Sequence, residues 1–270
     1  MRKTLTTLAA AGLVVALPGV AAAEDGRYTA DLAAMNGGSG SATATIDLDG
    51  TTAAINISGS GFFDGFPHAL HIHGEPGGDN VCPPLDPGDG DFDDIASQSL
   101  EDGTPILSVA DGAPFYGGVA VSLTTEGDTT PDSALAVDRF PTSGSIDYSR
   151  TIELPQDVAD DLSSLHVVIH GTDLDGDGEI GPVAGTDAEG NETDNIPSSL
   201  DPELPIEATA PAACGQVSFA GASGDGGAVT VDTGAGGSAV DTTARDTGFA
   251  AALGLAALAA VGLRRRATLS

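Results

Sequence analysis

Apolar and polar residues alternate with a period of two along several short segments of this 270-residue chain, and this pattern predicts β-strands. Two such segments, residues 42–48 and 53–58, are separated by Asp49-Gly50. Asp-Gly between alternating segments is typical of a hairpin turn, so the two segments are expected to pair as neighbouring strands. The other expected strands carry the histidines described below or lie at residues 119–124, 145–152 and about 214–219.

Helix signals are few along the chain. The best candidate covers residues 155–162, where Pro155 stands early and acidic residues follow in the first turns. The acidic stretch 75–103 is rich in Gly, Pro and Asp without a strand or helix period, so a surface loop is expected there. Many short strands with Gly and Pro between them favour an all-β fold, an antiparallel Greek-key sandwich or barrel.

The two ends of the chain differ in composition from the strand-bearing part. Residues 1–23 combine a positive start, an apolar run and a small-residue cleavage site, which predicts a signal peptide. Residues 221–247 are rich in Gly, Ala and Asp and are expected to form a flexible spacer. The apolar run 248–263, about 24 Å long as a helix, predicts a transmembrane anchor, with the basic end 264–270 on the cytoplasmic side. A folded domain at 24–220 is therefore expected on the extracellular face, anchored to the cell membrane or the cell wall.

The charge of the chain excludes one class of partner. All 40 acidic residues lie between Glu24 and Asp246, a span with four arginines and no lysine, so its formal charge is −36. Such a field repels nucleic acid and anionic lipid surfaces and attracts divalent cations. Nucleic-acid binding is therefore not expected. Solubility in a salty or wall-exposed setting is an alternative explanation of the same charge.

Three of the five histidines, His68, His71 and His73, stand close together in the chain. In an extended segment His71 and His73 point to one side, and Leu70 and Ile72 point to the other. Two imidazoles in front of an aliphatic stripe are how a strand presents metal ligands from a packed core. The alternative is that these histidines are hydrogen-bonded residues that fix the strand and its loops.

The other two histidines, His166 and His170, share one face of the segment 165–171. Four residues along a strand span about 13 Å, so these two are not expected to bind one metal without a bend. The sequence therefore predicts a histidine cluster carried by two strands, with His68 and His166 as further candidate ligands. Imidazole suits copper and zinc, so either ion is the expected cofactor.

Two cysteines, Cys82 and Cys214, occur in a chain that is expected to be exported. One disulfide is the natural interpretation, because a pair of free thiols is less common outside the cell. The bond would close a loop of roughly 130 residues and, by chain-entropy estimates, stabilise the fold by about 4 to 5 kcal/mol.

Four short motifs follow one another along the chain. They are His68-x-x-His71-x-His73, Cys82, Val168-Ile169-His170 and Ala213-Cys214-Gly215. This ordered set resembles the copper–zinc superoxide dismutases, and residues 40–74 also resemble chordin-type (CHRD) domains, in which a strand pair precedes a His-Ile-His-Gly strand. The resemblance implies a superoxide dismutase-like fold. The copper ligands and the disulfide that it implies are His71, His73, His170 and Cys82–Cys214.

The chain also departs from the dismutase pattern. No histidine lies between His73 and His166, so the bridging and zinc-loop histidines of that family have no counterpart. The segment 209–212 stands where the family has its active-site arginine and contains no arginine. The expected function is therefore a non-catalytic surface domain with a copper or zinc site. The alternatives are an atypical copper superoxide dismutase and a structural or adhesive module without a metal.

A second candidate site is the acidic segment that begins at Asp173. Its spacing of acids, with Gly178 in the sixth position, matches the opening of an EF-hand calcium loop. The twelfth position is Ala184, where such a loop needs a bidentate Glu. A weakened calcium loop closed by Asp187 or Glu189, and an acidic turn without an ion, therefore both stay open. The candidate calcium ligands are Asp173, Asp175, Asp177 and Glu179.

Overall fold

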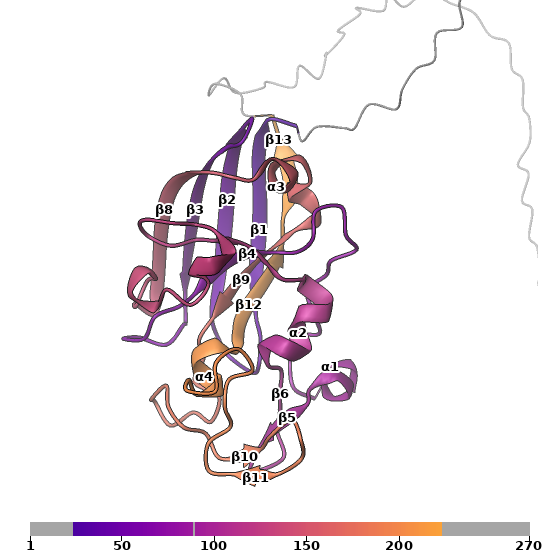
Figure 1. Cartoon of the computed structure of the whole chain (residues 1–270), viewed down its shortest axis with the longest axis vertical. Coiled ribbons are helices and arrows are strands. Elements are labelled where there is room, and N and C mark those ends of the chain that lie inside the picture. The colour runs from indigo at the N-terminus through magenta and orange to yellow at the C-terminus, as the bar shows by residue number, and fades with distance from the viewer. Residues whose placement is uncertain (1–23, 89, 223–270) are drawn as a thin grey trace, which may run out of the picture. The chain divides into compact units, whose positions relative to one another are not determined.

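The computed structural model describes residues 24–88 and 90–222, and this part is built mainly from antiparallel β-strands (Figure 1). The expected signal peptide at 1–23, the spacer from residue 223 onward, the transmembrane anchor at 248–263 and the basic end at 264–270 lie outside the described residues. Within the described ranges, every helix is too short or too polar to span a membrane.

The main sheet has nine strands, and every pair of neighbours is antiparallel. Its order is β7-β4-β9-β12-β1-β2-β3-β8, and β13 also pairs with β1. The strands are β1 (Gly26–Ala34), β2 (Ser41–Asp49), β3 (Thr52–Ser60), β4 (Leu70–His73), β7 (Val119–Ser122), β8 (Ser145–Glu153), β9 (His166–His170), β12 (Pro211–Gln216) and β13 (Ser218–Gly221).

A small second sheet and four short helices complete the described part. The sheet has the order β11-β10-β5-β6 and lies at the lower end of Figure 1. Its strands are β5 (Gln98–Leu100), β6 (Pro105–Ile106), β10 (Gly185–Thr186) and β11 (Glu192–Thr193). The helices are α1 (Gly90–Ile95), α2 (Val109–Tyr116), α3 (Gln156–Asp160) and α4 (Ile206–Thr209), with 3-10 turns at Pro131–Ser133, Val137–Arg139 and Leu162–Ser164.

The predicted first hairpin is confirmed as β2 and β3. Gly50 stands in its turn at φ +61°, a left-handed conformation that glycine adopts without a steric penalty. Alternation along both strands buries one side, so that Ile46 and Ile55 face each other across the pair and lie in the core. The period-two pattern therefore identified both the strands and their inward face.

The main sheet curls on itself. Ile46 and Ile55 from the hairpin share one core cluster with Ile72 of β4 and Ile169 of β9, although these strands are far apart in the sheet order. No backbone ladder joins the edge strands β7 and β8 within the described residues, so the sheet is a half-barrel with an open seam. The described fold is therefore mostly antiparallel β, as expected.

Two segments differ from the predictions. The stretch 75–103 is not only a surface loop, because it contains α1 and β5; the buried ring of Phe92 anchors α1 on the disulfide region. The single closing strand expected at 214–219 is two strands, β12 and β13, with the buried Val217 between them. The helix predicted at 155–162 appears as α3, preceded by Pro155.

The Cys82–Cys214 disulfide is present, with the two Cα atoms 5.9 Å apart. It joins the segment after β4 to β12, directly beside Val168 of the second histidine strand. The bond therefore holds a long connection against the strand that carries His170.

Replacing both cysteines with alanine is expected to lower the free energy of unfolding by about 4 kcal/mol, because the unfolded chain then gains the entropy of an open loop. Urea unfolding at pH 7 measures this as a lower midpoint. The oxidised wild-type protein treated with reductant is the control and should reach the same midpoint as the double variant. Midpoints equal to that of the oxidised protein would show that the cross-link constrains little.

Candidate metal centre

Strands β4 and β9 bring the two histidine segments side by side. They are antiparallel neighbours in which His71 lies opposite Val168, and His73 lies opposite His166. Leu70 and Ile72 point into the core cluster, while His71 and His73 stand on the other side of the strand. The alternation that the sequence predicts for this strand is therefore confirmed.

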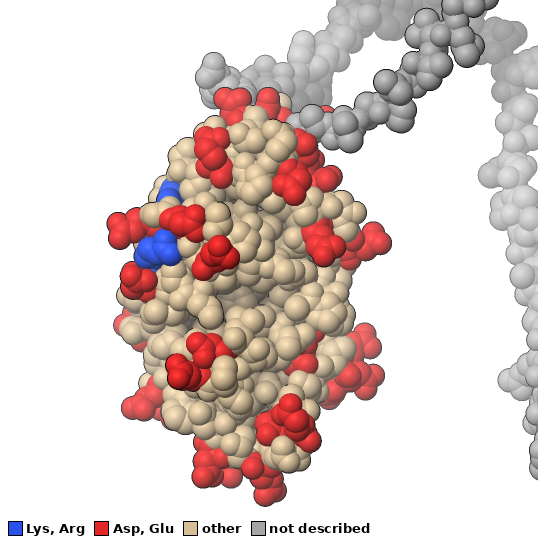
Figure 2. Space-filling model, in the orientation of Figure 1, with Lys and Arg blue, Asp and Glu red and all other residues tan. Residues whose placement is uncertain are grey.

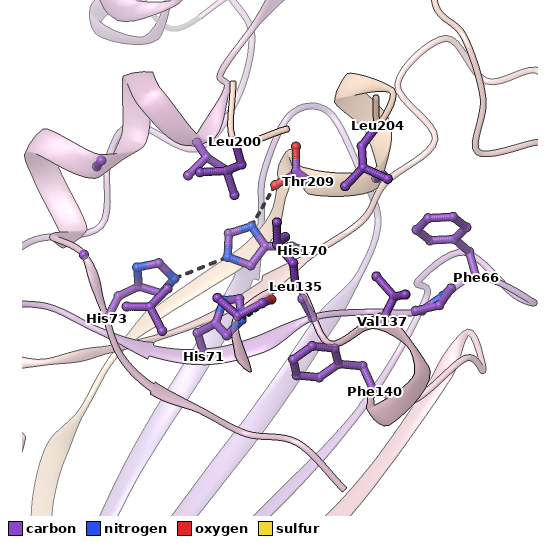
Figure 3. Close-up of a pocket in the computed structure, with 18 of the residues that line it drawn as sticks. Phe66, His71, His73, Leu135, Val137, Phe140, His170, Leu200, Leu204 and Thr209 are labelled. Carbon is purple, nitrogen blue, oxygen red and sulfur yellow. Dashed lines mark hydrogen bonds between the residues drawn. The ribbon is translucent and has the colours of Figure 1, made fainter. Parts of the chain in front are cut away.

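The rings of His71, His73 and His170 converge at one point (Figure 3). One ring nitrogen from each lies within 4.8 Å of the others, and all three side chains are buried. The ring centroids are 5.1 to 5.5 Å apart. His170 reaches this point from the end of β9, where its backbone N–H donates to the carbonyl of Ala69 just before β4.

A backbone carbonyl fixes the orientation of each ring. One nitrogen of each imidazole donates an N–H to that carbonyl, which leaves the lone pair of the other nitrogen free. The acceptors are Ala134 for His71 Nε2 (3.1 Å), Gly117 for His73 Nδ1 (3.0 Å) and Thr209 for His170 Nδ1 (2.8 Å). The nitrogens left for a ligand are therefore Nδ1 of His71 and Nε2 of both His73 and His170.

These three nitrogens are poorly satisfied by the protein itself. His71 Nδ1 is buried without a hydrogen-bond partner. His73 Nε2 and His170 Nε2 face each other at 3.3 Å, and because the proton of each ring is on Nδ1, neither Nε2 has a hydrogen to donate to the other. A buried nitrogen without a partner costs about 1–3 kcal/mol. A metal ion bound by all three nitrogens would remove that cost, so the donor set fits copper or zinc.

Burial keeps the three rings neutral, as metal ligands must be. Removal from water, together with the nearby ring of His170, lowers the pKa of His73 to about 3. Burial also lowers the pKa of His170 to about 4, against the opposing effect of its hydrogen bond to Thr209. The pKa of His71 falls well below its usual value of 6.5 for the same reason, with the other two rings adding to the shift.

The loop after β7 forms a wall of the site. It supplies the Ala134 carbonyl and the ring of Phe140, which meets the His71 ring edge-on at 5.7 Å. Two arginines hold the loop in place: Arg150 of β8 donates to the Thr124 carbonyl at 2.7 Å, and Arg139 donates to carbonyl and hydroxyl groups within the loop. The Arg150 contact also bridges the open seam of the half-barrel, because Thr124 follows β7.

A cavity of about 340 Å³ opens above the three rings. Its walls come from α2, α4, the segment before β4 and the loop after β7. Figure 3 shows Leu135, Val137, Leu200, Leu204 and Phe66 around this space, beside the three histidines. The histidines are therefore shielded by apolar groups yet next to a hollow that a small molecule could enter.

His68 lies outside the cluster. Its Nδ1 is 3.0 Å from the His170 carbonyl and its Nε2 is 2.7 Å from the Phe63 carbonyl, so it ties the entry of β4 to the end of β9. His68 therefore matches the alternative interpretation, a hydrogen-bonded histidine that fixes the strand and its loops.

His166 also lies outside the cluster, although it is fully buried opposite His73. Both of its ring nitrogens lack a hydrogen-bond partner, and burial lowers its pKa. The three-histidine group contains His170 but not His166, as expected for two residues four positions apart in a strand.

Replacing His166 with leucine is expected to raise the free energy of unfolding by about 1 kcal/mol, because two unsatisfied buried nitrogens disappear. Urea unfolding at pH 7 measures the change. Metal retention should stay at the wild-type level, and a variant that no longer holds the metal would make His166 a ligand after all.

The acidic segment brings Asp173, Asp175 and Asp177 together, with carboxylate oxygens within 4.8 Å of one another. Glu179 does not belong to this group. The carboxylates accept backbone N–H groups of their own loop, and the buried Glu207 accepts those of Leu174 and Gly181 at its two ends. The loop is therefore held by the protein itself, and a calcium ion there stays a prediction.

Calcium at millimolar concentration is expected to raise the melting temperature if the acidic loop binds it, because a ligand of the native state alone stabilises that state. Thermal unfolding with and without calcium measures the shift, and Asp175→Asn is the variant that should abolish it. An unchanged melting temperature of the wild-type protein would count against the site.

The three carbonyl acceptors were not predicted from the sequence. Every residue carries a carbonyl, so Ala134 and Thr209 give no signal of their role. Gly117 gives a weak one: its φ is +80°, and a Cβ there would lie 2.6 Å from the Cα of Gly74, so only glycine fits.

No protein-family model matches the chain, and no curated protein matches it.

Proposed function

We propose that this protein is an exported, membrane-tethered surface domain that holds a copper or zinc ion at His71, His73 and His170 and does not catalyse a reaction. The observation that carries the proposal is the convergence of three buried imidazole nitrogens. Each is free to bind a metal because the other nitrogen of the same ring donates its hydrogen to a backbone carbonyl. The disulfide is compatible with an extracellular location.

The proposal includes a fold of the superoxide dismutase-like or CHRD type, with Greek-key connections. Its support is the curled antiparallel sheet and the position of the histidines on two adjacent strands. The Cys82–Cys214 bond, next to the second histidine strand, agrees with the disulfide that the resemblance implies.

The first alternative, an atypical copper superoxide dismutase, has less support. Superoxide is an anion, and the residues that line the cavity include no lysine or arginine to attract it. The span that contains the domain carries a formal charge of −36, which slows the approach of any anion. This negative field therefore favours a protein that binds a metal without fast superoxide dismutation.

Loading the purified protein with copper, followed by dialysis, tests the proposal. One retained copper per chain with a d–d absorption band is expected, together with no superoxide consumption above that of free buffer. Fast superoxide consumption would favour the dismutase alternative. No retained copper or zinc would leave a structural or adhesive module without a metal.

A further inference from the structure

Exposed apolar side chains gather around the mouth of the cavity. Among the described residues, five large apolar side chains are exposed, and three of them line this cavity. The three are Leu135, Val137 and Leu200, which are 40%, 48% and 50% exposed. Exposed apolar groups that cluster around one opening mark a binding site more often than single ones scattered over a surface.

The cavity has the size and chemistry of a small-molecule site. Its volume of about 340 Å³ lies at the lower end for ligand pockets. A cavity of about 150 Å³ with apolar walls accommodates benzene, so this one has room for a molecule of one or two rings. Apart from the three histidines and Thr209, its lining consists of apolar side chains and glycines.

Charge disfavours both cations and anions as ligands. No Asp, Glu, Lys or Arg side chain lines the cavity, so the bound metal ion would be the one full charge inside it, and that ion repels cations. Acidic side chains surround the largely uncharged centre of the face in Figure 2, and they repel anions that approach the protein. An uncharged ligand avoids both penalties.

A metal ion held by the three histidines would have room for one more donor atom. Three protein ligands leave a zinc or copper ion with room for a further ligand, as in metal sites that bind a substrate or water. The three histidines line the floor of the cavity, so a molecule within it lies beside the ion that they would hold.

We infer that the cavity binds a neutral aromatic molecule of one or two rings, whose single nitrogen or hydroxyl donor completes the coordination of the metal. The inference rests on the proposed metal site and adds to it the class of ligand. The rings of the ligand lie against the apolar walls, and the bond from its donor atom to the metal sets the orientation of the ligand.

Calorimetry with 4-phenylimidazole on the zinc-loaded protein tests the inference. One equivalent is expected to bind about ten- to a hundredfold more tightly than imidazole, because the extra ring is buried against the walls. Benzoate, an anion of similar size, should bind more weakly than 4-phenylimidazole, because the acidic surface of the protein repels it. Zinc analysis before and after the titration establishes that the ion stays in the protein.

Two variants with the same chemical change locate the ligand. Val137→Asp places a charge at the mouth and should weaken 4-phenylimidazole binding by about tenfold or more. Val81→Asp changes a side chain of similar exposure, 49%, outside the cavity and should leave the affinity unchanged.

The outcomes separate the two proposals. Zinc that is never retained overturns the proposed function and the inference together, before any ligand is added. Zinc that is retained while 4-phenylimidazole binds no better than imidazole, or while both variants behave alike, overturns the inference alone.

Discussion

Replacing His73 with alanine is expected to abolish retention of the metal. The variant removes one of the three nitrogens, together with a carbonyl-fixed ring whose Nε2 lies 3.3 Å from Nε2 of His170. Loss of a residue that merely orients a ligand typically weakens metal binding by 10- to 100-fold, so loss of a ligand should exceed about 100-fold. Metal analysis after dialysis, and competition with a chelator of known affinity, measure the effect.

His73 also contacts the ring of Tyr116 edge-on at 4.7 Å, so the alanine variant will lose stability as well as a ligand. His73→Gln keeps most of the volume and should still lose the metal. His166→Leu is the matched control, because it removes a buried histidine from the directly opposite position on β9. Equal metal retention in the His73→Gln and His166→Leu proteins would contradict the proposed ligand set.

Acidification is expected to unfold the metal-free protein between pH 6.5 and about 4. The folded-state pKa values of His73 and His170, about 3 and 4, lie below the value of about 6.5 for an exposed histidine. The unfolded chain therefore takes up protons first as the pH falls. Stability that is fully present above pH 6.5 is lost progressively toward pH 3, by roughly 5 kcal/mol or more.

Urea unfolding of the metal-free protein at half-unit steps from pH 7 to pH 4 measures this loss. The double variant with glutamine at residues 73 and 170 should show a much flatter dependence over the same range, since it lacks both titrating groups. Zinc should move the loss to lower pH, because protons and metal compete for the same nitrogens. A metal-free wild-type protein of constant stability from pH 6.5 to pH 4 would contradict the buried, neutral cluster.

The strand pattern was predictable where one side of a strand meets the core. Alternation placed Ile72 on the core face of β4 and His73 on the opposite face, because a period of two follows from strand geometry alone. The first hairpin was predictable for the same reason, with Gly50 marking its turn. The resemblance to known families supplied the pairing of His170 with the first strand, which periodicity cannot give.

The parts that escaped prediction depend on single contacts. Helix α1 has one buried anchor, Phe92, and therefore no repeating pattern. Helix α2 contains Pro114, a residue that normally argues against a helix interior, although Ser108 and Asp111 form a capping box at its start. The walls of the apolar cavity come from two helices and two other segments that are distant in the sequence, and no local sequence rule predicts that these parts meet.

The two arginines that hold the wall of the site donate to uncharged groups. Arg150 donates hydrogen bonds to the carbonyl and the hydroxyl of Thr124, and Arg139 donates one to the Ser133 hydroxyl. Dissolved ions screen attraction between full charges, such as the exposed Arg27–Asp47 pair, far more than they weaken bonds to neutral oxygens. At high salt concentration the repulsion among the acidic residues of this chain is screened, which favours the folded state. The loop that encloses the histidines should keep its conformation under the same conditions.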